Sequence, residues 1–142
     1  MLASLIDFLV SSPLLINLLL LLLIVLDVVL SVLALFLPNT WFKLFHNQPY
    51  VDPQGLLRRT GAVWVAFTLL QFLAYMKWPE QPYWLVVIAG VRLTELFSDW
   101  TYLYFAQNVT PVGRLSLWIA PPANLVMGWS FIESVLKLTT GE

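Results

Sequence analysis

The sequence contains no cysteine, a single histidine and few charged residues. Without cysteine, the chain has no internal disulfide, thiolate metal site or iron–sulfur cluster. One histidine, His46, cannot provide two-histidine ligation of a haem or a metal within one chain. Charged residues make up only 11% of the 142 residues, which is too few for the polar shell of a soluble domain. The net charge of −1 argues against a nucleic-acid partner.

The sequence contains several long apolar runs. Hydrophobic residues account for 60% of the chain, and the mean hydropathy is +0.83. A helix needs about 20 apolar residues to cross a bilayer, and several runs reach this length. The runs are continuous rather than alternating in polarity, which favours helices over the strands of a membrane barrel. We therefore predict an all-α integral membrane protein in which residues 1–142 form a single membrane domain.

Proline, glycine and asparagine divide the chain into four predicted transmembrane helices, packed as a bundle. Asp52 and Pro53 have the pattern of an N-cap followed by proline at the first helical position. Pro121 and Pro122 fall inside the last helix and predict a kink or a restart there, because proline has no backbone donor. The predicted helices cover residues 13–37, 54–76, 83–106 and 112–137.

A short helix lying in the membrane interface is expected between the first two transmembrane helices. Aromatic and apolar residues flank Lys43 there, which is typical of a segment at the level of the lipid headgroups. In such a place we expect His46 to be solvated rather than to be an axial ligand of a pigment or haem. The residues expected to contact the interface are Trp41, Phe42, Phe45 and His46.

The basic residues predict the orientation in the membrane. Cytoplasmic connections carry an excess of lysine and arginine. Four basic residues lie in the connections on one side, Lys43, Arg58, Arg59 and Arg114, and two lie on the other, Lys77 and Lys137. The connections between helices one and two and between helices three and four are therefore expected in the cytoplasm, with both termini outside. The expected location is the inner membrane of a prokaryotic cell.

The third predicted helix carries charges in its middle. Arg92, Glu95 and Asp99 are spaced by three and four residues, so they share one face within about 60°. A charge that faces lipid costs about 3 kcal/mol or more, so this face must look into protein or water. Every other helix also carries a stripe of polar or small residues at a similar depth. We predict a buried polar cluster formed by Asp27, Gln71, Arg92, Glu95, Asp99 and Asn124.

Three carboxylates accompany one guanidinium in this cluster. Arg92 can bind one of them bidentately, either Asp27 across the bundle or Glu95 on its own helix. The other acids must be protonated, hydrated, or paired with a cation or a partner protein. The favoured interpretation is that the cluster joins the helices and fixes their register. A proton or cation pathway is the second interpretation, and a ligand site or a docking face for another subunit is the third.

No catalytic residues or nucleotide-binding motif stand out, so an enzyme acting on a lipid or a quinone has the least support. We expect no cofactor in the chain alone; a lipid, quinone, carotenoid or pigment, if one binds, is expected at a subunit interface. The sequence predicts a small accessory subunit of a larger membrane complex, in contact with lipids and with other integral subunits or copies of itself. The alternative is a small oligomeric transporter or channel, coupled to protons or cations through the intramembrane carboxylates.

Overall fold

The computed structural model describes residues 2–10 and 12–140, and their regular structure is helical. Among these residues, the only strand-like pairing is an isolated antiparallel bridge between His46 and Val109. The predicted all-α class is confirmed, and a short helix is present between the first two long ones. The elements are α1 (Leu2–Leu9), α2 (Pro13–Phe36), α3 (Pro38–Phe45), α4 (Leu56–Lys77), α5 (Tyr83–Phe105) and α6 (Pro111–Thr140).

Two of the four long helices are long and apolar enough to cross a membrane. These are α2, with a mean hydropathy of 3.2 over its most apolar stretch, and α6, with a value of 1.2. Three charged residues, Arg92, Glu95 and Asp99, lie along α5. Basic residues near both ends of α4 and Gln71 in its interior lower the hydropathy of that helix. By length and composition, two of the four expected membrane spans, α2 and α6, are therefore supported.

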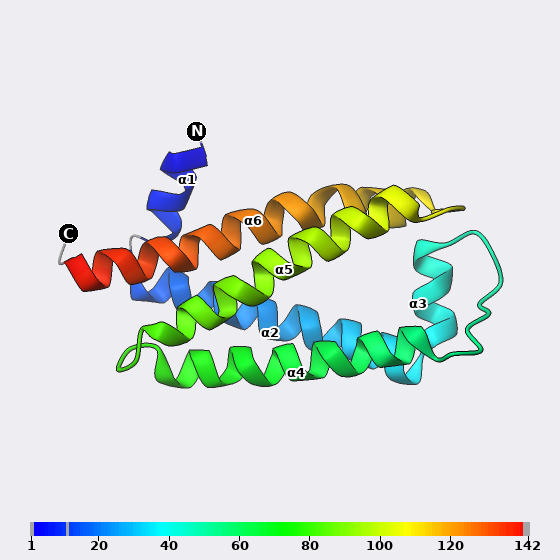
Figure 1. Ribbon diagram of the computed structural model, residues 1–142, viewed down its shortest axis with the longest axis horizontal. Helices are drawn as coiled ribbons and strands as arrows, with labels where there is room; N and C mark the ends of the chain where they lie inside the picture. The colour runs from blue at the N-terminus through cyan, green and yellow to red at the C-terminus, as the bar shows by residue number, and fades with distance from the viewer. Residues whose placement is uncertain (1, 11, 141–142) are drawn as a thin grey trace.

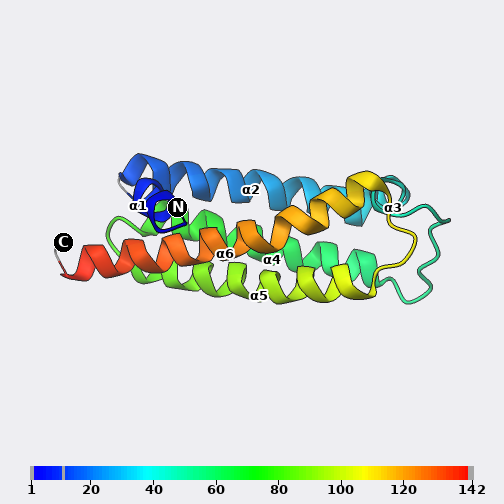
Figure 2. The same ribbon diagram turned by 90° about the horizontal axis from the view of Figure 1, so that it is seen from above.

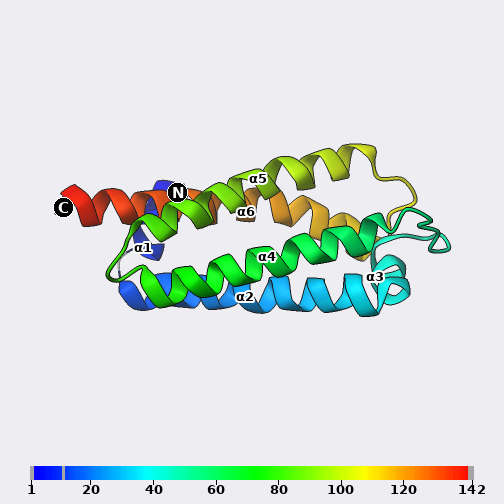
Figure 3. The ribbon, with the colours of Figure 1, turned by 60° about the horizontal axis from the view of Figure 1, so that its bottom comes forward.

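The long helices form two antiparallel pairs, α2 with α4 and α5 with α6. The pairs come together near the α4–α5 turn and diverge toward the other end, where α3 lies across the bundle (Figure 1). The view in Figure 3 shows the same pairing from below. Helix α1 packs beside the C-terminal part of α6, where Asp7 and Lys137 form an exposed ion pair at 3.0 Å.

The hydrophobic core fills the half of the bundle that lies near the α4–α5 turn. All four long helices contribute fully buried side chains to it, among them Leu20, Ala74, Leu85, Ile88 and Phe131. The indole N–H of Trp78 closes this end by donating to Asn17 Oδ1 at 2.7 Å. The surface around the bundle is formed largely by exposed leucine, valine and aromatic side chains. The molecule therefore buries apolar groups in one half and leaves apolar groups outside along its whole length.

The start of α4 differs from the prediction. The helix begins at Leu56, so Pro53 is not its first helical residue. Gly55 takes the left-handed conformation (φ 66°), which a glycine adopts without steric cost, and the chain turns once more before the helix begins. Asp52 still caps the helix, because its carboxylate accepts hydrogen bonds from the N–H groups of Leu57 at 2.9 Å and Leu56 at 2.8 Å. These bonds hold the pKa of Asp52 below its usual value.

Helix α6 runs without interruption through Pro121 and Pro122. A restart at Pro121, one of the two predicted outcomes, does not occur. The helix instead changes direction near its middle, as Figure 2 shows. The two prolines lack N–H groups, so the carbonyls of Leu117 and Trp118 have no helical donor, and this loss permits the bend.

Glycines allow α6 to approach its neighbours closely. A Cβ on Gly128 would lie 3.0 Å from Leu93 Cγ on α5. A Cβ on Gly113 would lie 2.6 Å from the carbonyl oxygen of Phe45, at the end of α3. The same Phe45 carbonyl accepts a hydrogen bond from the backbone of Thr110 at 2.9 Å. The absence of a side chain at Gly113 thus lets the end of α3 rest on the start of α6.

We expect Gly113→Ala to destabilise the protein by about 1–3 kcal/mol, because the new methyl group would collide with backbone that cannot rotate away. The matched control is Gly90→Ala on α5, where a Cβ would meet nothing within 4 Å. That control should be neutral or slightly stabilising, because alanine is the better helix former. Thermal unfolding in detergent measures both. Equal midpoints for the two variants would show that α3 and α6 are not in close contact.

Candidate functional site

Asp27, Gln71 and Arg92 form a buried polar layer across the middle of the bundle. Arg92 Nη2 donates to Asp27 Oδ2 at 2.9 Å, and Gln71 Nε2 donates to the same oxygen at 2.6 Å. None of the three residues is more than 2% exposed. Of the two partners that the sequence allows for Arg92, the structure selects Asp27. The layer joins α2 and α4 of one helix pair to α5 of the other.

The opposite charges of Asp27 and Arg92 compensate one another in this layer. Removing a lone carboxylate or guanidinium from water costs several kcal/mol, and only close pairing with further hydrogen bonds offsets this cost. Gln71 provides one such bond, and the Arg92 guanidinium lies 5.9 Å from the centre of the Phe67 ring. The pair also lies directly beside the hydrophobic core, since Ile88 and Ala89 come one turn before Arg92 on α5.

A cavity of about 380 Å³ opens between the helix pairs, on the side of the polar layer that faces α3. A second hollow of similar volume, about 380 Å³, reaches from this cavity to the loop before α4. Asp27 and Arg92 line the first hollow but not the second, so they mark its inner end. We call the two hollows together the acidic cavity. The residues that line both are Trp41, Trp64, Glu95, Asp99 and Tyr102.

Glu95 and Asp99 supply the acidic groups of this cavity. Asp99 Oδ2 accepts a hydrogen bond from Asn124 Nδ2 at 2.8 Å, and Glu95 lines the cavity together with Trp64. Both acids are partly buried, and neither forms an ion pair within residues 2–10 and 12–140. Within these ranges, no three histidine, aspartate or glutamate side chains come together to hold a metal ion. The cavity thus contains two carboxylates whose charge no paired cation compensates.

His46 lies at the end of α3 and is only 7% exposed, so the expectation that it is solvated is wrong. Its Nδ1 lies 3.1 Å from the carbonyl oxygen of Gln107, which can only accept, so Nδ1 donates. In the neutral ring, Nε2 then accepts from the hydroxyl of Tyr102. The ring also stacks on Phe42, with 4.5 Å between centroids. The imidazole is buried because the chain after α5 covers it. Its two hydrogen-bond partners are Gln107 in this segment and Tyr102 on α5.

The structure brings the six residues of the predicted polar cluster together in two groups. One group is the closed layer, and the other lines the acidic cavity. Asp27, Gln71 and Arg92 belong to the first, whereas Glu95, Asp99 and Asn124 belong to the second. Among the residues predicted at the membrane interface, Trp41 and His46 are buried, Phe45 lines the cavity, and Phe42 stacks on His46. Their contact with a membrane stays a prediction.

Trp64 and Tyr102 line the cavity but are missing from the predicted cluster. Tyr102 follows Asp99 by three residues and so continues the spacing of residues 92, 95 and 99 along α5. Extending the charged stripe by one more turn would therefore have found it. Trp64 belongs to a stripe of polar and aromatic residues on α4, and only its place beside Glu95 in the cavity lining distinguishes it from a packing residue.

We expect Arg92→Leu to cost about 3–5 kcal/mol of stability, because it leaves Asp27 as an unpaired buried charge. Combining Arg92→Leu with Asp27→Asn should recover most of this loss, since the asparagine is neutral and can still bond to Gln71. A double-mutant cycle by thermal unfolding in detergent measures the recovery. Without any recovery, Asp27 would not be the energetic partner of Arg92.

Protein-family models, curated proteins and solved structures were compared with this chain, and none of them matches. The functional argument therefore rests on the geometry of the residues themselves. That geometry consists of a neutralised polar layer, a cavity with two unpaired carboxylates, and an outer surface made of large apolar side chains.

Proposed function

We propose that the chain is an integral membrane protein in which all four long helices cross the bilayer. The observation that supports this most strongly is that α4 and α5 turn polar side chains into the bundle and large apolar side chains outward. Gln71 and Arg92 are buried inside the bundle, whereas Leu69, Phe72 and Phe97 face outward. The shortest long helix, α4, has 22 residues and would extend about 33 Å, against a hydrocarbon thickness of about 30 Å. Charged residues lower the hydropathy of these helices, but Arg92, Glu95 and Asp99 of α5 are buried or partly buried, and the exposed basic residues of α4 lie near its two ends.

Within the membrane, we propose that the protein is a small accessory subunit without catalytic activity, in the inner membrane of a prokaryotic cell. The longest connection among the described residues is 46–55, so little structure is left outside the helices to carry another function. The salt bridge Asp27–Arg92 neutralises itself within the chain, which suits a structural role.

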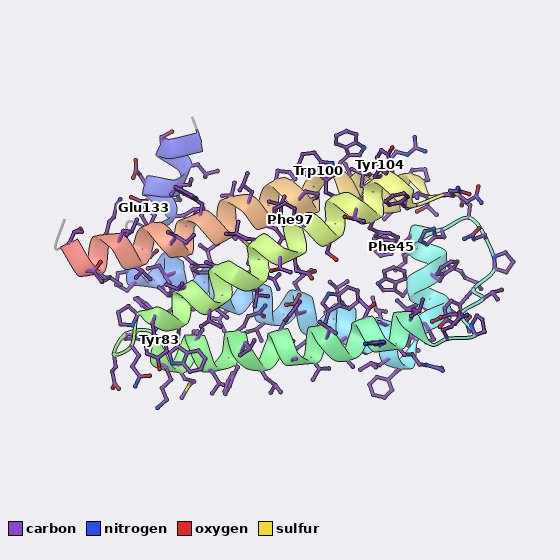
Figure 4. All side chains as sticks on the ribbon, in the orientation of Figure 1. Phe45, Tyr83, Phe97, Trp100, Tyr104 and Glu133 are labelled. Carbon is purple, nitrogen blue, oxygen red and sulfur yellow. The ribbon has the colours of Figure 1, made fainter. Side chains whose placement is uncertain are left out.

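The outer surface of α5 and α6 supports a role in assembly. Phe97, Trp100 and Tyr104 on α5 are all more than 60% exposed, as is Trp118 on α6. Figure 4 labels Trp100 and Tyr104 at the edge of the bundle away from α4, and Phe97 over the middle of α5. Large rings of this kind suit contact with lipid headgroups or with the apolar face of another integral subunit, or of a second copy of this chain.

A proton- or cation-coupled pathway is the second candidate, because Glu95 and Asp99 line a cavity and have no paired cation. The extent of the cavity argues against it. The cavity ends at Asp27 and Arg92, and the close-packed core fills the bundle beyond them. An ion would have to pass a closed salt bridge and a layer of buried leucine and phenylalanine, so the accessory role has the better support.

The proposed topology is tested by single cysteines, for which the chain is well suited because it has none of its own. In intact cells, Gln54→Cys should be protected from an impermeant thiol reagent, and Gln81→Cys should react. The reason is that residue 54 lies in the connection predicted to be cytoplasmic and residue 81 in the connection predicted outside. Permeabilised cells are the control and should label both. The reverse pattern in intact cells would overturn the orientation.

The accessory role predicts that liposomes containing the purified protein show no more proton or sodium flux than empty liposomes. Glu95→Gln and Asp99→Asn should change thermal stability or assembly and leave flux at this background. The measurement is flux driven by a pH gradient and by a Na⁺ gradient, with folding checked for each variant. A wild-type flux well above background that either folded variant abolishes would favour the pathway.

Assembly is tested in the native membrane at the natural expression level. The chain should migrate in native electrophoresis with a larger assembly, and Trp100→Leu with Trp118→Leu should shift it toward the monomer without changing its thermal midpoint. Phe36→Leu with Phe72→Leu, which changes exposed rings of the other helix pair, is the matched control. A chain that migrates only as a monomer would contradict the accessory role.

A further inference from the structure

The acidic cavity contains a buried donor without a partner. Trp41 is only 7% exposed and lines both hollows, and its indole N–H makes no hydrogen bond within the described residues. A buried donor left unsatisfied costs about 1–3 kcal/mol. Such a group is expected to be paired with an acceptor that enters the cavity.

The charge of the cavity favours a positive occupant. The Arg92 guanidinium is bound to Asp27, so it does not pair with the acids of the cavity. Asp99 receives a hydrogen bond from the neutral side chain of Asn124, and neither Asp99 nor Glu95 forms an ion pair within the described residues. Counted with Asp27, the site has three carboxylates for one guanidinium, and a cation beside Glu95 and Asp99 would reduce this imbalance.

The walls of the cavity favour an organic cation over a metal ion. Aromatic side chains surround the two acids, and aromatic faces attract ammonium groups. Metal ions need several oxygen or nitrogen ligands, and among the described residues no three acids or histidines lie so that they could hold one together. The volume of about 380 Å³ is in the range of sites for small organic ligands. The aromatic residues that line the two hollows are Trp41, Phe42, Phe45, Tyr50, Trp64 and Tyr102.

We propose that the acidic cavity binds an organic ammonium ion that carries an apolar substituent. The ammonium group lies against Glu95 and Asp99, with the rings of Trp64 and Tyr102 beside it. The substituent extends toward α6, where Ala120, Ala123 and Met127 form an apolar wall. An oxygen of the ligand, or a water that it retains, accepts the hydrogen bond from Trp41.

The helix packing explains why the space exists. Figure 4 shows the side chain of Phe45 pointing from α3 into the region between the helix pairs. The bend of α6 comes next to Ala120 and Ala123, whose small side chains leave room that a leucine would fill. The two pairs are therefore held apart at one end by α3 and together at the other by the core.

The experiment compares benzyltrimethylammonium with its uncharged isostere, neopentylbenzene, by titration calorimetry of the purified protein in a maltoside detergent. The two probes have the same shape, so a difference in affinity reports the charge. We expect the cation to bind at least tenfold more tightly, with empty micelles as the blank. Equal affinities, or no binding of the cation, would overturn the proposal.

Substitutions of the cavity acids test whether benzyltrimethylammonium binds in this cavity. Glu95→Gln and Asp99→Asn should each weaken the cation at least tenfold and leave the neutral probe unchanged. Glu133→Gln is the matched control, because Glu133 is a partly buried acid of α6 that lies outside the cavity, toward the C-terminus (Figure 4). It should leave both affinities unchanged. If Asp99→Asn fails to fold, Trp64→Leu replaces it, with the same expectation. An equal loss in Glu133→Gln would contradict the assignment.

Competition distinguishes the two sources of such an ammonium group, a lipid headgroup and a free amine. Dihexanoyl phosphatidylcholine and dihexanoyl phosphatidylglycerol share their acyl chains, and only the first has an ammonium group. Displacement of the probe by the choline lipid alone identifies a headgroup, and displacement by neither identifies a free amine. Equal displacement by both would show that apolar chains are bound and would contradict the proposal. None of these outcomes depends on the accessory role, because all are measured on the isolated protein.

Discussion

The salt bridge between Asp27 and Arg92 is the contact on which the arrangement of the bundle depends. It connects α2 to α5, and these helices belong to different pairs that otherwise diverge toward α3. Gln71 adds α4 to the same contact through the shared carboxylate oxygen. The core on one side of this contact excludes water, which strengthens the attraction between the two charges.

The two halves of the bundle differ because of what lies on each side of this layer. Toward the α4–α5 turn, leucine, isoleucine and phenylalanine side chains form the buried core, and no charged residue is among them. Toward α3, the inward positions are held by Glu95, Asp99 and aromatic side chains, which cannot pack as closely and leave a cavity. The stable half can therefore hold the helices together while the other half remains available to a ligand.

Much of the fold could be predicted from the sequence, because long apolar runs and prolines determine where helices lie. The inward face of α5 was also predictable, because Arg92, Glu95 and Asp99 lie on the same side of the helix and charged groups are not expected to face lipid. The partner of Arg92 was not, because Asp27 is 65 residues away and only the packing decides between it and Glu95. His46 shows the same limit: its burial depends on Gln107 and Tyr102, which are distant in the chain and give no local signal.

The separation of Asp27 and Arg92 along the chain sets an order for membrane insertion. In the proposed topology with four membrane crossings, α2 leaves the ribosome well before α5. An arginine that enters lipid alone is strongly disfavoured, so α5 is expected to wait at the translocation channel until it can reach the carboxylate of α2. The hairpin of α2 and α4 would then serve as the template on which the second hairpin assembles, and synthesis from the N-terminus delivers the two hairpins in that order.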